Sequence, residues 1–217
     1  MDGEWEVTAL EAATVNLIGG EISLDFTNTL YGHGEAGGII DEYLTSYTAL
    51  AAWSAHVGVL THEQARALAT EATRRPADAE DVLRRAVTLR EALYRIWEAC
   101  QREAAPDDAD LSVLNGELSN ALMRARVAVF DGEPRWSWQE QEDALDRPLW
   151  PIARAAAELM TSERRRRVRA CPGPRCGWLF LDTSKNGSRR WCAMGSCGNR
   201  EKARRHYSRR RSESSSV

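Results

Sequence analysis

Four cysteines near the carboxyl end constrain the fold of this chain more than any other feature. Cys171, Cys176, Cys192 and Cys197 form two pairs, each with four residues between its members, and the 217 residues contain one further cysteine, Cys100. Two short loops that each offer two thiolates are what a tetrahedral Zn²⁺ requires. The alternatives are two disulfides or four unrelated buried thiols. No signal peptide or apolar span of membrane length precedes the cysteines, so we expect a reducing cytoplasm, no membrane partner and no disulfides. The spacing therefore predicts one structural zinc ion.

Charge is divided unevenly along the chain. Residues 164–211 contain 16 Lys or Arg and two acidic residues, a net charge of +14. The whole chain carries −3, so the remainder carries −17. A strongly basic segment built around a metal site is typical of nucleic-acid contact. The alternative is a solvated arginine-rich tail that binds polyanions without selectivity.

Length and hydropathy allow one substantial core and one small module, since 43% of the residues are hydrophobic. Residues 1–167 are predicted to form the core domain, with a role in sensing or oligomerisation. Residues 168–211 are too few to build an adequate apolar core, so the metal must supply much of their folding free energy. We therefore expect the body to stay folded when this module unfolds. The serine-rich residues 212–217 are expected to be disordered.

Apolar periodicity predicts a mainly α fold with a small β content. Thr61 and Gln64 are typical of a capping box, and Asp78 is expected to cap a long helix. Asp131-Gly132 predicts a β-hairpin within the helical body. The last helix of the body is expected to continue as a rod into the zinc module. The predicted helices cover about 41–57, 61–75, 78–100, 110–122 and 148–167.

The zinc module is predicted to be a β-hairpin followed by a helix. Residues 178–181 are strand-like, Asn186-Gly187 is typical of a tight turn, and residues 189–191 are expected to return as the second strand. Glycines and prolines around the first cysteine pair favour a loop whose N–H groups point at the thiolates. From Cys197 onward the sequence favours a helix, whose amino end stabilises a thiolate.

A helical wheel divides this last helix into two faces. Ala203 and Tyr207, with Arg200 beside them, are expected to pack on the hairpin, and Arg200 is expected to have a mixed or structural role. The opposite face is expected to bind phosphates, together with the arginine run that precedes the module. The predicted nucleic-acid-binding residues are Lys202, Arg205, Arg209, Arg164, Arg165 and Arg166.

Asp25 and Asn28 lie within an apolar run of the body. Such residues either satisfy backbone amides or line a ligand pocket, and the first use is the more common. The second would give the protein a small-molecule effector site or an active site. The scattered histidines form no catalytic cluster, and four thiolates leave zinc no open position, so we expect that the protein is not an enzyme.

Two motifs resemble known families. Cys197-Gly-Asn-Arg200, which closes the four-cysteine segment, resembles the CGNR zinc finger. The run from Leu24 to Thr29, Leu-Asp-Phe-Thr-Asn-Thr, is similar to the amino-terminal ABATE domain that accompanies this finger. The resemblance implies a bacterial stress-induced transcription regulator with zinc held by the four cysteines.

These observations together predict a cytoplasmic regulator that binds double-stranded DNA through its zinc module and basic helix. The alternative is a zinc-stapled module that binds RNA or an acidic protein without sequence-specific DNA binding. A homodimer and an effector both remain open at this stage.

Overall fold

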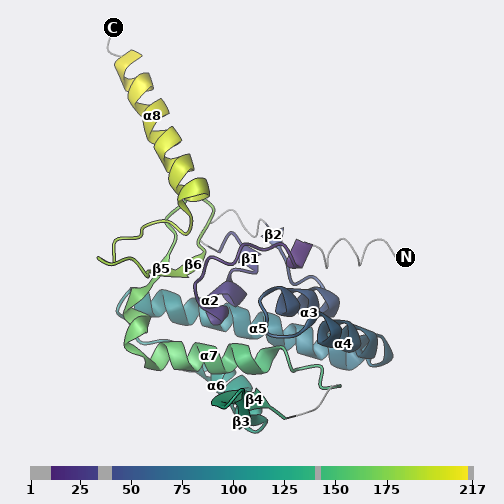
Figure 1. Ribbon diagram of the computed structural model, residues 1–217. Coiled ribbons are helices and arrows are strands. Elements are labelled where there is room, and N and C mark those ends of the chain that lie inside the picture. Colours follow the sequence, from purple (N-terminus) through teal and green to yellow (C-terminus); the bar gives the residue numbers. More distant parts are fainter. Residues whose placement is uncertain (1–10, 34–40, 140–142, 215–217) are drawn as a thin grey trace.

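The computed structural model describes residues 11–33, 41–139 and 143–214, with side chains described as far as Ser208. The fold is mainly helical with small antiparallel sheets, as the sequence predicted (Figure 1). The helices are α2 (Ile22–Thr27), α3 (Tyr47–His56), α4 (His62–Arg74), α5 (Pro76–Gln101), α6 (Asp108–Leu122), α7 (Leu149–Thr161) and α8 (Asn199–Ser214). The strands are β1 (Leu30–Tyr31), β2 (Asp41–Glu42), β3 (Ala125–Phe130), β4 (Glu133–Trp138), β5 (Val168–Ala170) and β6 (Leu179–Leu181). A 3₁₀ helix covers Glu163–Arg167 and a π-helical turn covers Met194–Gly198.

Helix α5 is the spine of the body, and α2, α3, α4 and α6 all contact it. Its apolar side is buried at Val82, Leu89, Leu93 and Ile96, and Cys100 is half-buried at its end. Proline at the first position and Asp78 in the first turn favour helix formation here. The predicted capping role of Asp78 is wrong: the helix begins two residues earlier, and Asp78 pairs with Arg75 instead.

Side-chain caps set the start of the neighbouring helices. The predicted capping box of Thr61 and Gln64 is present at the start of α4. The predicted helix from residue 41 begins later, at Tyr47, because the Ser46 hydroxyl accepts the Ala49 N–H and ends the extended segment before it. Residues 41–42 form strand β2, which pairs with β1.

The predicted continuous rod between the body and the zinc module is wrong. Helix α7 ends at Thr161 because Ser162 has an extended backbone with φ −90° and ψ 160°. The arginine run then forms the 3₁₀ helix Glu163–Arg167 and passes directly into β5.

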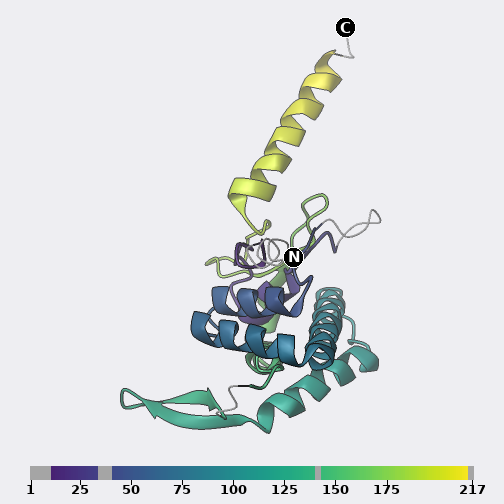
Figure 2. The same ribbon diagram turned by 90° about the vertical axis from the view of Figure 1, so that its right-hand side faces the viewer.

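The hairpin predicted from Asp131-Gly132 is confirmed and forms an arm, β3–β4. Asp131 and Gly132 both have positive φ, 50° and 82°, as a type I′ turn requires. Figure 2 shows the arm extending beyond the helices, at the end of the molecule opposite to α8.

The zinc module contains a hairpin and a helix, but the predicted strand partner is wrong. Strand β6 pairs with β5, so that Val168 lies opposite Leu181, and not with residues 189–191. The loop between the two strands carries the first cysteine pair, and the Cys171 N–H extends the ladder to the Trp178 carbonyl at 2.8 Å. The predicted turn at Asn186 is present, but it joins irregular segments.

Helix α8 projects away from the rest of the molecule (Figure 1). The predicted packing of Ala203 and Tyr207 on the hairpin is therefore wrong: Tyr207 is 70% exposed, and Ala203 is also exposed. The helix continues to Ser214, so residues 212–214 are helical where a disordered tail was expected, and residues 215–217 lie outside the described part of the chain.

The body and the zinc module share their hydrophobic cores. The four cysteines, Trp178 and Phe180 belong to the same buried cluster as the cores of α3, α4 and α5. A second cluster joins body and hairpin side chains: Leu24, Tyr94, Trp97, Leu159, Val168, Leu179 and Leu181. The expectation that the body folds independently of the metal module does not agree with this packing.

Within the described residues, no helix combines the length and apolar character that a membrane span requires.

Candidate metal centre

The four predicted ligands meet at one buried point. The sulfurs of Cys171, Cys176, Cys192 and Cys197 all lie within 4.8 Å of one another, and no side chain in the group is more than 4% exposed. Tetrahedral Zn–S bonds of about 2.3 Å place neighbouring sulfurs roughly 3.8 Å apart. The Cys176–Cys192 and Cys192–Cys197 sulfur separations are 3.7 and 3.6 Å. These separations are too long for disulfides, which need about 2.05 Å, and they fit one zinc ion with four thiolate ligands.

Local backbone geometry prepares the centre for thiolates. The N–H groups of Cys192 and Gly173 point at the Cys171 sulfur, and that of Trp178 points at the Cys176 sulfur, as the loop composition predicted. A Cβ at Gly173 would lie 3.1 Å from the Cys197 sulfur and 3.4 Å from the Cys171 sulfur. Glycine at this position therefore allows the loop backbone to lie close to the sulfurs of both cysteine pairs.

Without metal, the thiols of the cluster hydrogen-bond to one another. Hydrogen bonds from the thiols of Cys176 and Cys192 lower the pKa of Cys171, and the contact with Cys171 raises the pKa of Cys176. Zinc needs thiolates, so its binding releases the protons that the cluster holds.

Arg200 connects the metal centre to the body. Its guanidinium donates to the Cys197 sulfur at 3.6 Å and to the Tyr31 hydroxyl at 3.3 Å, and this hydroxyl is the main cause of the raised pKa of Arg200. The Tyr31 ring packs edge-on against Trp178, whose indole N–H donates to the Leu30 carbonyl at 2.9 Å. These contacts fix the first turn of α8 relative to β1, in agreement with the structural role predicted for Arg200.

Sequence reasoning missed Arg189 and Asp182, which hold the second cysteine loop. The Arg189 guanidinium lies 4.4 Å over the Phe180 ring and donates to backbone carbonyls, among them that of Cys192. The buried Asp182 carboxylate accepts the backbone N–H groups of Ser184 and Arg189 and the Ser184 hydroxyl. The Ser184 hydroxyl is the main cause of the lowered pKa of Asp182. The Asp-x-Ser pattern is typical of such a turn, whereas Arg189 is hidden within a basic run.

Asn28 forms a direct link between body and module. Its side-chain amide donates to the Leu179 carbonyl and accepts the Leu179 N–H, both at 2.8 Å. Asp25 is 6% exposed and accepts the Gly19 N–H at 2.7 Å. Both side chains thus satisfy backbone groups, which is the first of the two roles considered for them.

The stability contributed by Asp25 should depend on pH. Burial raises its pKa from 3.8 to about 6, so the folded protein holds this proton more tightly than the unfolded chain does. The stabilisation that Asp25 contributes is then fully present below the pKa that this carboxyl has in the unfolded chain, and it is lost as pH rises through about 6. Between about pH 5 and pH 7 the urea unfolding free energy of the wild type should fall by about 1 kcal/mol relative to Asp25→Asn, which keeps an acceptor for Gly19. A pH-independent difference between the two, with exposed Asp108→Asn as control, would contradict this.

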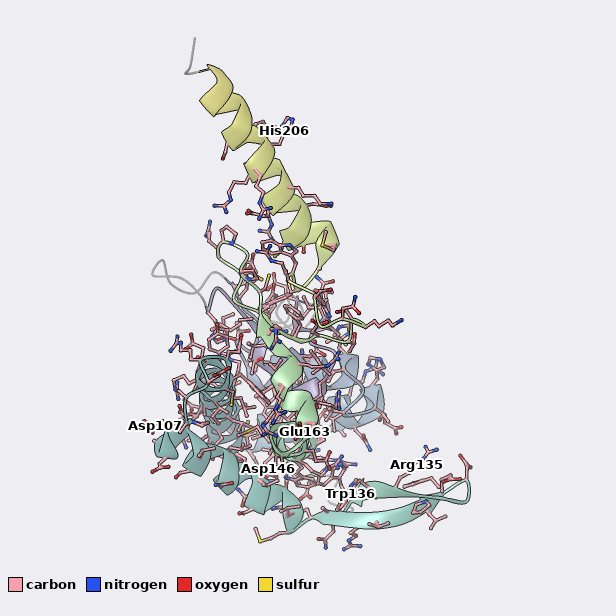
Figure 3. The ribbon with its side chains drawn as sticks, turned by 90° about the vertical axis from the view of Figure 1, so that its left-hand side faces the viewer. Asp107, Arg135, Trp136, Asp146, Glu163 and His206 are labelled. Atoms are coloured by element: carbon pink, nitrogen blue, oxygen red, sulfur yellow. The ribbon has the colours of Figure 1, made fainter. Side chains whose placement is uncertain are left out.

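The predicted nucleic-acid-binding residues lie in two groups. On α8, Lys202 is exposed, and Arg205 is exposed but pairs with Glu201 at 2.9 Å. Arg209 belongs to α8, and its side chain lies outside the described residues. The second group is the 3₁₀ helix below the base of α8, where Glu163 is labelled in Figure 3.

In this second group the structure brings arginines together beside the end of α5. Arg164 is exposed, and Arg166 pairs with Glu163 at 3.2 Å. Arg165, Arg166 and Arg169 line a cleft of about 620 Å³ together with Trp97, Cys100 and Gln101.

Comparison with known families agrees with this geometry. The model of the ABATE family, described as "Putative stress-induced transcription regulator", matches residues 20–163, and that of the CGNR zinc finger matches residues 167–210. No curated protein matched the sequence. Since the first match spans well over half of the 217 residues, the chain belongs to the ABATE family and carries a CGNR zinc finger at its carboxyl end.

Proposed function

We propose that this protein is a cytoplasmic transcription regulator that binds double-stranded DNA by placing α8 in the major groove. The observation that carries this is the position of α8: its described side chains from Lys202 to Ser208 are all exposed, although the helix begins at the metal centre. A helix without tertiary cover does not persist on intrinsic propensity alone, so an external partner is expected to stabilise it.

The dimensions and charge of α8 support DNA as that partner. Its 16 residues contain seven Lys or Arg and two Glu, a net charge of +5. At 1.5 Å per residue the helix is about 24 Å long, and its width of roughly 10–12 Å matches the ~12 Å of the B-DNA major groove. Exposed Tyr207 and His206, the latter labelled on the projecting helix in Figure 3, are available for contacts with base edges.

The base of α8 is held firmly enough to orient the helix. Arg200 ties its first turn to Tyr31 and Cys197, and Glu201 pairs with Arg204 and Arg205 at 2.9 Å. The hydrogen bond from Arg204, followed by that from Arg205, lowers the pKa of Glu201. Both arginines remain more than 60% exposed, so they can exchange this partner for phosphates.

We assign further phosphate contacts to Arg164, Arg165 and Arg166 on the 3₁₀ helix Glu163–Arg167, which lies beneath α8 in the view of Figure 3. The zinc is structural, and we assign the protein no catalytic activity, because four thiolates leave no coordination position for substrate. We assign no effector to Asp25 and Asn28, since both side chains are bonded to backbone groups.

Replacing Lys202, Arg205 and Arg209 together by Ala should weaken binding to duplex DNA and reduce its salt dependence. If about five phosphates are neutralised, the slope of log K against log salt should be near −4 to −5, and the triple variant should flatten it by about three units. Fluorescence anisotropy with a labelled duplex over a salt series measures both quantities.

The matched control is Arg66, Arg74 and Arg84 replaced together by Ala. These arginines are exposed on α4 and α5, and their loss changes net charge by the same amount away from α8. The control should leave the slope unchanged. Equal effects of both triples would show that binding follows net charge alone, and tighter binding of structured RNA than of duplex DNA would favour the RNA-binding alternative.

A further inference from the structure

The hairpin arm has one fully apolar face. Residues that alternate along two paired strands share a face, and the observed register places Val127 opposite Trp136 and Val129 opposite Pro134. With Ala125 opposite Trp138 at the base, this face contains no polar side chain. The other face carries Arg126, Ala128, Phe130, Glu133, Arg135 and Ser137.

Only the base of this face is covered by the body. Trp138 packs against Trp150 with ring centroids 5.9 Å apart, and the Arg154 guanidinium lies 5.1 Å from the Trp136 ring. Further out, Val127 and Val129 are 67% and 68% exposed, and Trp136 is 51% exposed. Figure 3 shows Arg135 and Trp136 on the part of the arm that extends away from the helices. A two-stranded hairpin with an uncovered apolar face is marginally stable in water and presents unpaired edges.

Strand β3 offers the better of the two edges. Phe130 and Glu133 close the two-residue turn, and positions alternate between bonded and non-bonded along an antiparallel pair. Pro134, which has no N–H, lies opposite Val129, in agreement with a non-bonded pair at that position. The backbone groups of Val127 and Val129 therefore point to the outer edge of β3, while the outer edge of β4 lacks a donor at Pro134.

We propose that the chain forms a twofold dimer in which β3 pairs antiparallel with β3 of a second copy, with Ala128 on the axis. In this register Val127 lies opposite Val129 of the partner, and each of the two apolar rows reads Trp136, Val127, Val129, Pro134 across four strands. On the polar face, Arg126 lies opposite the partner's Phe130, beyond which lies the partner's Glu133. Apolar side chains therefore meet across the axis in both rows of the apolar face, and on the polar face the partner's Phe130 ring lies between Arg126 and the partner's Glu133.

Size and position agree with a second copy as the occupant. In this register the two β3 strands pair over residues 126–130, and Val127 and Val129, which are 67% and 68% exposed, gain an apolar neighbour across the axis. An interface of this extent lies at the low end of protein–protein interfaces, below ~1,200 Å² in total, so we expect micromolar dissociation. The arm lies at the opposite end of the molecule from α8, so pairing through it leaves α8 of each copy uncovered (Figure 1).

Sedimentation velocity without DNA, over roughly 1–100 µM chain, tests this independently of the proposed function. The wild type should pass from monomer to dimer, and Val127→Lys should raise the dissociation constant about 10-fold, because on both copies it replaces the apolar contact with the partner's Val129 by a charged side chain. Leu17→Lys is the matched control, since Leu17 is an exposed apolar residue away from the arm, 40% exposed. Circular dichroism and thermal melts check that each variant folds.

The register is tested by cross-linking and by charge exchange. Non-bonded pairs on an antiparallel axis have Cα atoms about 4.5 Å apart, which suits a disulfide. Ala128→Cys should therefore cross-link to itself under mild oxidation, whereas Arg126→Cys and the wild type should not. Arg126→Glu and Glu133→Arg should each weaken the dimer by less than Val127→Lys does, because two strand spacings of about 4.8 Å separate Arg126 from the partner's Glu133, and the two changes together should restore the affinity.

A wild-type chain that stays monomeric throughout, or a dimer that Val127→Lys leaves unchanged, would overturn the dimer. A dimer in which Arg126→Cys cross-links and Ala128→Cys does not would overturn this register.

Discussion

Removing zinc should destabilise the whole chain and unfold more than the cysteine loops. Structural zinc contributes roughly 10–16 kcal/mol to the folding of isolated fingers. Here the ligands belong to the same buried cluster as the cores of α3, α4 and α5, and the hairpin β5–β6 packs with Leu24, Trp97 and Leu159. Loss of even about 5 kcal/mol would lower the melting temperature by roughly 10–20 °C in a protein of this size. Chelation followed by circular dichroism should therefore show loss of body helix together with a lowered melting temperature.

Two cysteine variants separate the metal from the thiol chemistry. Cys192→Ser removes one ligand, whereas Cys100→Ser makes the same change at a half-buried thiol outside the cluster. We expect Cys192→Ser to reproduce the effect of chelation and Cys100→Ser to stay close to the wild type. Amide hydrogen exchange shows which helices lose protection when zinc is removed. If protection in α5 and α7 were unchanged after zinc removal, the body would fold alone, as the sequence first suggested.

Local signals explain what the sequence could predict. The cysteine spacing identified all four ligands, because a zinc site built from two knuckles depends on short-range spacing. Thr61 with Gln64 located the start of α4, and Asp131-Gly132 located the arm, because caps and tight turns are determined by a few adjacent residues.

Features that depend on distant partners could not be predicted in this way. Strand β5 has three residues, Val-Arg-Ala, which follow directly after the helix expected over 148–167 in an arginine-rich stretch, so nothing in its composition indicates a strand. A helical wheel correctly groups Ala203 with Tyr207 but cannot show whether anything lies opposite them. Likewise, the role of Arg189 depends on the Phe180 ring and on carbonyls from separate segments.

Asn28 is the clearest case, since its partner Leu179 lies 151 residues away. Asn28→Ala should lower the free energy of unfolding by roughly 3–5 kcal/mol, because it leaves a buried N–H and a buried carbonyl of Leu179 without partners. Since β6 continues from the loop that holds Cys171 and Cys176, the variant should also release zinc faster. Urea unfolding measures the first effect, and transfer of zinc to a chromogenic chelator measures the second.

Two further variants distinguish lost hydrogen bonds from lost volume. Asn28→Asp keeps nearly the same size and the acceptor for the Leu179 N–H, but it places a carboxylate oxygen against the Leu179 carbonyl. It should therefore be at least as destabilising as Asn28→Ala. Asn115→Ala, an exposed position in α6, should change stability by no more than about 0.5 kcal/mol. If Asn28→Asp matched the wild type in stability and in zinc release, the amide link would not be what holds β6 to α2, and the shared apolar core alone would join the two parts.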